Sequence, residues 1–423
     1  MRSYHASVKE LILPENHSSG TASICFISIL SRSLISTGIL FATIVLSWTI
    51  VVSACPFCSS LPRTLSDDLE EGTSAVIARC ESITEESDEV WILRLRITEV
   101  VKGDGDLQDS VVEAVTTERP SKNSIYWMVG FSETQIQWAP PTKISAGGVS
   151  YVKGLIGLNE SGPKRLEYFL KYLQHPNEII AADAYNEFAE ASLEDIASLK
   201  NKLDRNWVIS QLRDAKAPLH RRRLCWTFLS QCGVAQDRSL FDELVHRREI
   251  DGSFEIGMDA AIACFIVLGG EKALAQIERD YLTDSAARFS DSFSAISAIR
   301  VCGTEMRVIP RARLARALRP VLARPTLADL VISDLARWKD WTAIDRMVEL
   351  FALPNEDARL IKPAVVLYLK NCPLPAAKNA LAKLRKMDPE AVKSAEASMM
   401  LYTGLPSVPV PPPDESASKE EPE

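Results

Sequence analysis

Two cysteines separated by two residues, Cys55 and Cys58, form the motif C-P-F-C, the spacing best suited to chemistry in this sequence. At a helix N-terminus such a pair supports thiol-disulfide exchange, because the helix dipole and exposed amides lower the pKa of the first thiol. Pro62 interrupts the helix that would follow, and no βαβ pattern continues the segment. Three interpretations stay open: a redox pair, a structural disulfide that joins Cys55 or Cys58 to Cys80, and lipidation of Cys55.

The other residue types that catalyse reactions or bind metals are scattered. After residue 54, the histidines His175, His220 and His246 lie far apart without partners at helical spacing, so no zinc ligand set is visible. Asp183 and Glu187 are four residues apart on one expected helix, but no third ligand follows, and we expect a solvated helix face. No G-x-S-x-G, P-loop or G-x-G-x-x-G motif occurs. The sequence therefore predicts no catalytic residue, no metal site and no cofactor.

A cluster of charged and aromatic residues, Asp334, Arg337, Trp338 and Trp341, is the expected partner surface. Its spacing puts Asp334 within reach of Arg337, and Arg337 one turn from Trp341, where a cation–π stack would form. Trp and Arg are favoured residues in binding hot spots. The alternative interpretation is that the two tryptophans pack between neighbouring helical hairpins.

Composition narrows the class of protein. A chain of 423 residues that is 46% hydrophobic and 25% charged has enough apolar material for two or three globular domains. The net charge of −8 argues against a nucleic-acid partner, because a phosphate backbone requires a basic face. We expect the basic islands at residues 220–223 and 307–324 to pair with acidic residues on neighbouring helices.

The segment 1–54 carries the signal for the protein's location. Residues 34–52 form an apolar run, and the tetrad V-S-A-C that ends at Cys55 is typical of a cleavage site and of a bacterial lipobox. The run is also long enough to stay as an uncleaved membrane anchor. Both outcomes predict an exported, membrane-associated protein of the cell envelope, with an unknown envelope protein as its partner.

Residues 55–160 are expected to form a β-rich domain. From about Thr73 to Gly157 the hydrophobic period is two; in one run the apolar Leu93 and Leu95 alternate with Arg94 and Arg96. Such runs, separated by turn residues, predict a small antiparallel barrel or sandwich. The predicted strands cover residues 74–83, 90–101, 110–118 and 125–131.

Residues 163–398 change to helical periodicity. Short apolar-striped segments joined by loops with Pro, Gly, Asn or Asp predict an irregular HEAT-like α-solenoid, so the fold class is α+β and multidomain. The apolar stretch 260–268 should end at Gly269 and Gly270, as an inner helix with a glycine cap does. Cys225, Cys264 and Cys302 lie in apolar runs and are expected in the core. The Pro-rich, acidic residues 405–423 should be disordered.

Several of these segments resemble a group of exported proteins of unknown function from planctomycete-type bacteria. The resemblance rests on A-C-P-F-C after the signal-like segment, R-I-T-E-V-V-K-G (96–103) and the helical residues 175–191 and 328–341. It implies a netrin-like or OB-like β domain followed by helical repeats, and no assigned activity. The β domain is also similar to inhibitors of metalloproteases, which use an N-terminal C-x-C, whereas this chain has C-x-x-C.

The function expected from the sequence is therefore that of a non-enzymatic, membrane-associated protein-binding scaffold, with the concave face of the helical region as its binding surface. Two alternatives remain. The first is a thiol-disulfide or redox-sensing protein that uses Cys55 and Cys58. The second is a protease-inhibitor-like module on a helical stalk.

Overall fold

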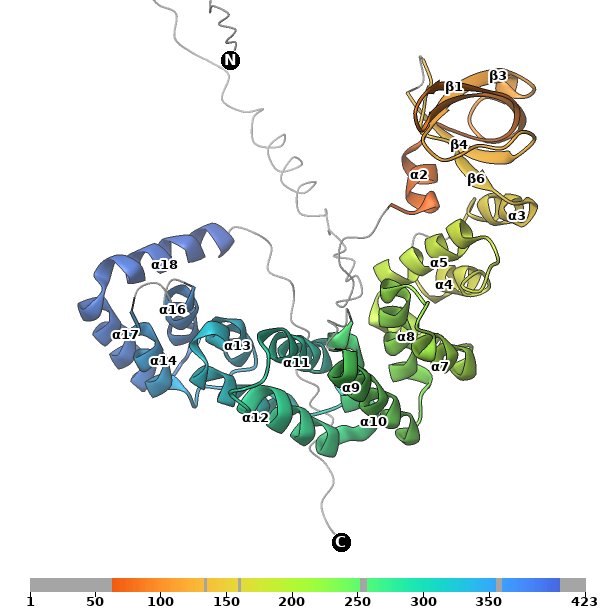
Figure 1. Cartoon of the computed structure of the whole chain (residues 1–423). Coiled ribbons are helices and arrows are strands. Elements are labelled where there is room, and N and C mark those ends of the chain that lie inside the picture. The colour runs from red at the N-terminus through yellow and green to blue at the C-terminus, as the bar shows by residue number, and fades with distance from the viewer. Residues whose placement is uncertain (1–62, 133–134, 159–160, 252–256, 355–359, 404–423) are drawn as a thin grey trace, which may run out of the picture. The chain divides into compact units, whose positions relative to one another are not determined.

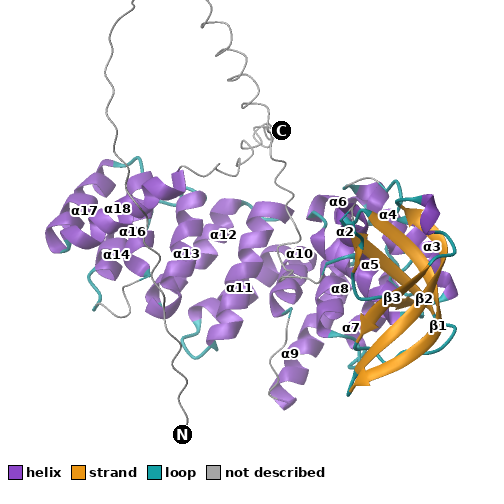
Figure 2. Cartoon of the chain, turned by 90° about the horizontal axis from the view of Figure 1, so that it is seen from above, coloured by secondary structure: helices purple, strands orange, loops and turns teal. Residues whose placement is uncertain are grey.

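A computed structural model describes residues 63–403 apart from 133–134, 159–160, 252–256 and 355–359 (Figure 1). This part of the chain is an α+β structure, in which an antiparallel sheet of six strands is followed by a long series of helices (Figure 2). Segments 1–54 and 405–423 lie outside the described residues. The predicted signal or anchor, the lipidation of Cys55, the Cys55–Cys58 pair and the disordered tail therefore stay predictions.

The strand runs expected from the sequence are observed. The strands occur in the order β3-β2-β1-β4-β5, all pairs are antiparallel, and β6 also pairs with β4. A tight turn with Glu89 at φ 63° connects β1 directly to β2. The strands are β1 Ser74–Ser87, β2 Val90–Lys102, β3 Val111–Thr116, β4 Ile125–Phe131, β5 Gln137–Trp138 and β6 Thr142–Ile144.

The sheet separates two hydrophobic cores. On one face Leu93 and Leu95 of β2 pack with Val76 and Met128, while Arg94 and Arg96 are exposed, as the period of two predicts. On the other face the central strands β1 and β4 turn a second set of apolar residues toward the helices, including Ile77, Trp127 and Val129. Residues 74–78 of β1 and most of β4 are therefore buried on both faces, which explains their nearly continuous apolar sequence, whereas the second half of β1 is largely exposed.

Two short helices flank the sheet in the chain, α2 Leu65–Glu71 before it and α3 Ala146–Gly154 after it. The expected period of two is wrong for α3. Ser145 begins this helix, because its hydroxyl accepts from the Gly148 amide at 3.2 Å, and Tyr151 is fully buried. Glycine lowers the helix propensity of this segment, so the N-cap and tertiary packing decide its conformation.

The predicted change to helices after residue 162 is observed. Helices pack against neighbours along the chain: α8 contacts α7 and α10, α11 contacts α10 and α13, and α16 contacts α13 and α18. The helices are α4 Pro163–Leu170, α5 Glu178–Glu190, α6 Leu193–Ser198, α7 Arg205–Arg213, α8 Leu219–Cys232, α9 Ser239–Asp251, α10 Met258–Ile277, α11 Phe289–Val301, α12 Arg311–Leu318, α13 Pro325–Arg337, α14 Ile344–Phe351, α16 Ile361–Asn371, α17 Pro375–Met387 and α18 Pro389–Thr403.

Helix α10 contains the most apolar helical stretch of the described chain. By length and composition Met258–Thr283 could cross a membrane, yet 56% of its most apolar window is buried inside the protein, as in the core helix of a globular protein. Gly270 has φ 60° and ψ −142°, so the helical path breaks there. This confirms the expected glycine stop.

The alternation in β2 can be tested by neighbouring substitutions. Leu95→Ala should lower the free energy of unfolding by about 2–5 kcal/mol, because Leu95 has no exposed surface and its truncation leaves a cavity. Arg94→Ala, at a side chain that is 58% exposed, should change it by less than about 0.5 kcal/mol. Urea denaturation followed by tryptophan fluorescence measures both variants. Equal losses would contradict the assigned faces of the strand.

Candidate functional site

Two carboxylates on α5, Asp183 and Glu187, lie where α2 and α3 meet the first helices of the helical region. The expectation of a solvated face is wrong: Asp183 is 5% exposed and Glu187 4% exposed. At four residues apart they share one face of α5 and point toward α2, α3 and α4.

Asp183 binds two elements that precede it in the chain. One carboxylate oxygen accepts from the Leu65 amide at 2.8 Å, and the other accepts from the Tyr151 hydroxyl at 2.5 Å. Leu65 is the first residue of α2, whose initial N–H groups have no partner inside the helix. Asp183 therefore holds the start of α2 from 118 residues away and fixes α3 at the same time.

Glu187 completes the junction. It accepts from the Ser66 hydroxyl at 2.5 Å, and from Nε and Nη2 of Arg165 at 3.0 and 2.6 Å. The Arg165 guanidinium also lies 5.1 Å from the ring centre of Phe169. Charge-assisted bonds of this kind compensate the cost of burying a carboxylate.

Burial sets the protonation of this cluster. Removal from water, aided by the nearby charge of Glu187, raises the pKa of Asp183 to about 7, although the hydrogen bonds from Tyr151 and the Leu65 amide oppose this shift. Burial raises the pKa of the Tyr151 phenol far above its usual range, so this hydroxyl remains a donor. Protein donors bind both oxygens of Asp183, so this carboxyl group connects α2 and α3 to α5.

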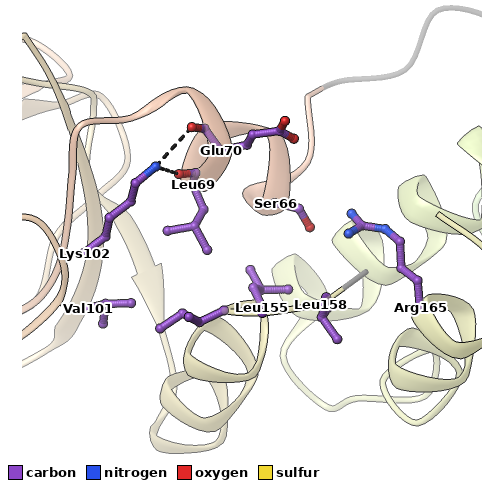
Figure 3. A pocket seen from close by; sticks show the side chains of 10 residues that line it. Ser66, Leu69, Glu70, Val101, Lys102, Leu155, Leu158 and Arg165 are labelled. Carbon is purple, nitrogen blue, oxygen red and sulfur yellow. Dashed lines mark hydrogen bonds between the residues drawn. The ribbon is translucent and has the colours of Figure 1, made fainter. Parts of the chain in front are cut away.

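A pocket of about 420 Å³ lies beside this junction (Figure 3). Nζ of Lys102 donates to the carbonyl oxygens of Leu69 at 2.7 Å and Glu70 at 3.0 Å, where a cation suits the C-terminal end of α2. Arg165 lies on another side of the pocket in Figure 3, bonded to Glu187. The pocket is lined by Ser66, Leu69, Glu70, Val101, Lys102, Leu155, Ile156, Gly157, Leu158 and Arg165.

The pocket walls are mainly aliphatic, and its cations already bind protein groups. Across the described ranges, no group of three His, Cys, Asp or Glu side chains is placed to hold a metal ion. Both cations of the pocket are therefore held by contacts within the junction.

The structure corrects the expected partner surface. Asp334 is fully buried and cannot contact a partner: Nε of Arg300 donates to both its oxygens at 3.0 and 2.9 Å, and Nη1 of Arg337 donates at 3.4 Å. The ring of Trp341 packs edge-to-face on Tyr368, with centroids 5.1 Å apart. Among the described contacts, Arg337 forms no cation–π stack with Trp341, because its guanidinium turns to Asp334.

Trp338 is half-buried and packs against a glycine on the neighbouring segment. A Cβ atom added at Gly303 would lie 2.5 Å from Cζ2 of Trp338, so the ring needs a residue without a side chain there. Arg337 keeps 45% of its side chain exposed. Of the four predicted surface residues, Arg337 is the one most available to a partner.

Most cysteines of the described residues belong to the cores, whereas Cys232 is partly buried. Cys80 of β1 carries a free thiol, has no exposed surface and faces Leu95 across the strand pair. Its expected pairing with Cys55 or Cys58 lies outside the described residues. Cys225, Cys264 and Cys302 are buried, as expected, and burial raises the pKa of Cys225 and of Cys302 to about 12.

No protein-family model matches the chain, and no curated protein matches it. A similar solved structure is human deoxyhypusine hydroxylase in complex with glycerol, at 14% sequence identity and a TM-score of 0.25, covering 60% of this chain and 87% of that chain. A likeness at this level carries no inference about activity, and the resemblance to exported bacterial proteins stays a prediction.

A signal for the buried carboxylates was present in the sequence. Ile180, Asp183, Ala184, Glu187 and Phe188 follow the i, i+3, i+4, i+7, i+8 pattern of one helix face. The two acids thus lie within the apolar stripe of α5 rather than opposite to it.

Asp183 should make stability depend on pH. Because its folded-state pKa of about 7 exceeds the unfolded value of about 3.9, the folded chain binds this proton more tightly. The resulting stability is complete below about pH 4 and is lost as the pH rises to about 7, by about 1.4 kcal/mol per pH unit. Relative to Asp183→Asn, the wild-type chain should lose about 2–3 kcal/mol between about pH 5 and pH 8 in urea denaturation.

The exposed Asp109 supplies a matched control, since Asp109→Asn removes the same charge where no burial acts. Its unfolding curve should follow the wild-type pH profile. A constant difference between wild type and Asp183→Asn across this pH range would refute the assigned protonation of the junction.

Buried thiols should also be protected from alkylation. At about pH 8 iodoacetamide should leave Cys80, Cys225, Cys264 and Cys302 unmodified in the folded chain, because only the exposed thiolate reacts. The same four residues should be modified in concentrated urea. Peptide mass spectrometry reads both reactions, and comparable rates with and without urea would show that these thiols are accessible.

Proposed function

We propose that this protein is an exported, membrane-associated protein-binding scaffold without enzymatic activity. A barrel-like β module precedes an irregular HEAT-like α-solenoid, and the solenoid carries the binding face. The observation that carries this proposal is a pair of exposed aromatic side chains on α11, flanked by arginines, in a series of stacked helices.

A recurring type of ion pair supports a solenoid. In each of four pairs an arginine bonds an acid that lies 32, 36, 43 or 34 residues later. Separations of this size match one two-helix repeat. Several of the acids are buried, so each pair joins successive helical hairpins at a fixed point. The pairs are Arg205–Asp237, Arg223–Asp259, Arg248–Asp291 and Arg300–Asp334.

A barrel-like sheet is supported by the composition of its enclosed core. Ala114 of β3 and Trp138 of β5 come from opposite ends of the strand order, yet they belong to one cluster with Leu93 and Leu95. Strands at the two ends contribute to a common core when a sheet curves strongly.

The α11 surface has the residue types of a binding hot spot. Phe289 is 55% exposed and Phe293 45% exposed, and their rings stack with centroids 6.3 Å apart. Arg288, 55% exposed, precedes the pair, and Arg300 follows it on the same helix. Exposed aromatics are costly in water and, together with arginine, dominate the energy of many interfaces.

Photo-crosslinking tests the scaffold proposal. The full chain with benzoylphenylalanine in place of Phe289, produced in the organism that encodes it, should give an adduct of discrete mass with an envelope protein. The same group at Val115, an exposed residue of β3, is the control and should give no such adduct. Equal labelling at both sites, or none at Phe289 with the protein recovered from the cytoplasm, would contradict the proposal.

A further inference from the structure

The α11 face is basic as well as apolar, which restricts what covers it. Arg300 and Arg337 share the single buried carboxylate of Asp334, and their side chains are 36% and 45% exposed. Phe293 precedes Arg300 by seven residues, or about 10 Å along the helix. A suitable occupant therefore has an apolar or proline-rich stretch followed within a few residues by acidic groups.

The chain contains a segment of this chemistry directly after its last described helix. Residues 405–413 read LPSVPVPPP, and residues 414–423 contain five acidic residues and one lysine. Proline-rich segments bind aromatic surfaces at a low entropy cost, because the polyproline II conformation is largely preformed. Carboxylates next to the prolines complement the exposed guanidinium groups.

The length of this segment matches the distance to be covered. Helices α18, α16, α13 and α11 contact one another in succession, so three helix-to-helix steps of about 8–10 Å each separate Thr403 from α11. As polyproline II at about 3.1 Å per residue, the ten residues 404–413 span about 31 Å. This length is sufficient to bring the prolines to the aromatic pair and the first acids beside it.

We propose that residues 405–423 of the same chain occupy the Phe289–Phe293 face, with the prolines on the two rings and the acidic residues on the exposed arginines. The inference rests on the proposed function, because the tail would cover the binding face and a partner would have to displace it. Partner binding is then limited by release of the tail.

Intrachain crosslinking of the purified full-length protein tests this occupant. Benzoylphenylalanine at Phe293 should link to residues 405–415 within one chain, and the same group at Val115 should not. The double substitution Asp414→Lys with Glu415→Lys should reduce the yield of this crosslink several-fold, because it removes the ionic contacts. High salt should reduce the yield in the same way, because it screens these contacts. Peptide mass spectrometry identifies the linked residues.

The other outcomes overturn either the tail proposal or the scaffold function, and they are distinguishable. A link between two copies, with a yield that rises with protein concentration, replaces the intrachain tail by a second molecule. No link to the tail, together with a persistent envelope-protein adduct in cells, rejects the tail and leaves the scaffold function intact. A tail link without any partner adduct in cells, even for the Asp414→Lys and Glu415→Lys chain, rejects the scaffold function instead.

Discussion

Burial of two carboxylates on one helix is the constraint on which the junction between sheet and helices depends. Asp183 and Glu187 lose their hydration, and the loss is tolerated only because α2, α3 and α4 each supply donors. Removal of any donor leaves a buried acceptor unsatisfied, at a cost of about 1–3 kcal/mol. The short α2, only seven residues long, depends on this contact more than on its own propensity.

The same principle recurs along the helical region in simpler form. Arg248 of α9 bonds Asp291 of α11, and Arg300 of α11 bonds Asp334 of α13. Apolar stripes bring such helices together without fixing their relative position, whereas a bidentate guanidinium–carboxylate pair has one preferred geometry. The pairs therefore fix the position of one helix against the next. The guanidinium of Arg337, which also bonds Asp334, stays partly exposed.

Several titratable groups of the described chain are enclosed by the fold, whereas the proposed binding face consists of exposed side chains. The thiols of Cys225 and Cys302 are held protonated by burial, and Asp183 is enclosed by its donors. By contrast, about half of the surface of Phe289 and of Phe293 remains in contact with water. A surface of this kind is stabilised when it is covered, and the acidic, proline-rich tail has the matching chemistry.

Local periodicity was enough to predict strands β1 to β4, most helices, the alternation of Leu95 with Arg94 and the break at Gly270, because these features depend on neighbours within a few residues. The short strands β5 and β6 were not predicted. Helix α3 was missed, since its glycines conceal a helix that capping and packing impose. The burial of Asp183, Glu187 and Asp334 was decided by tertiary structure alone. Their partners lie up to 121 residues away, and whether an acid is solvated or enclosed depends on which distant donors the fold brings to it.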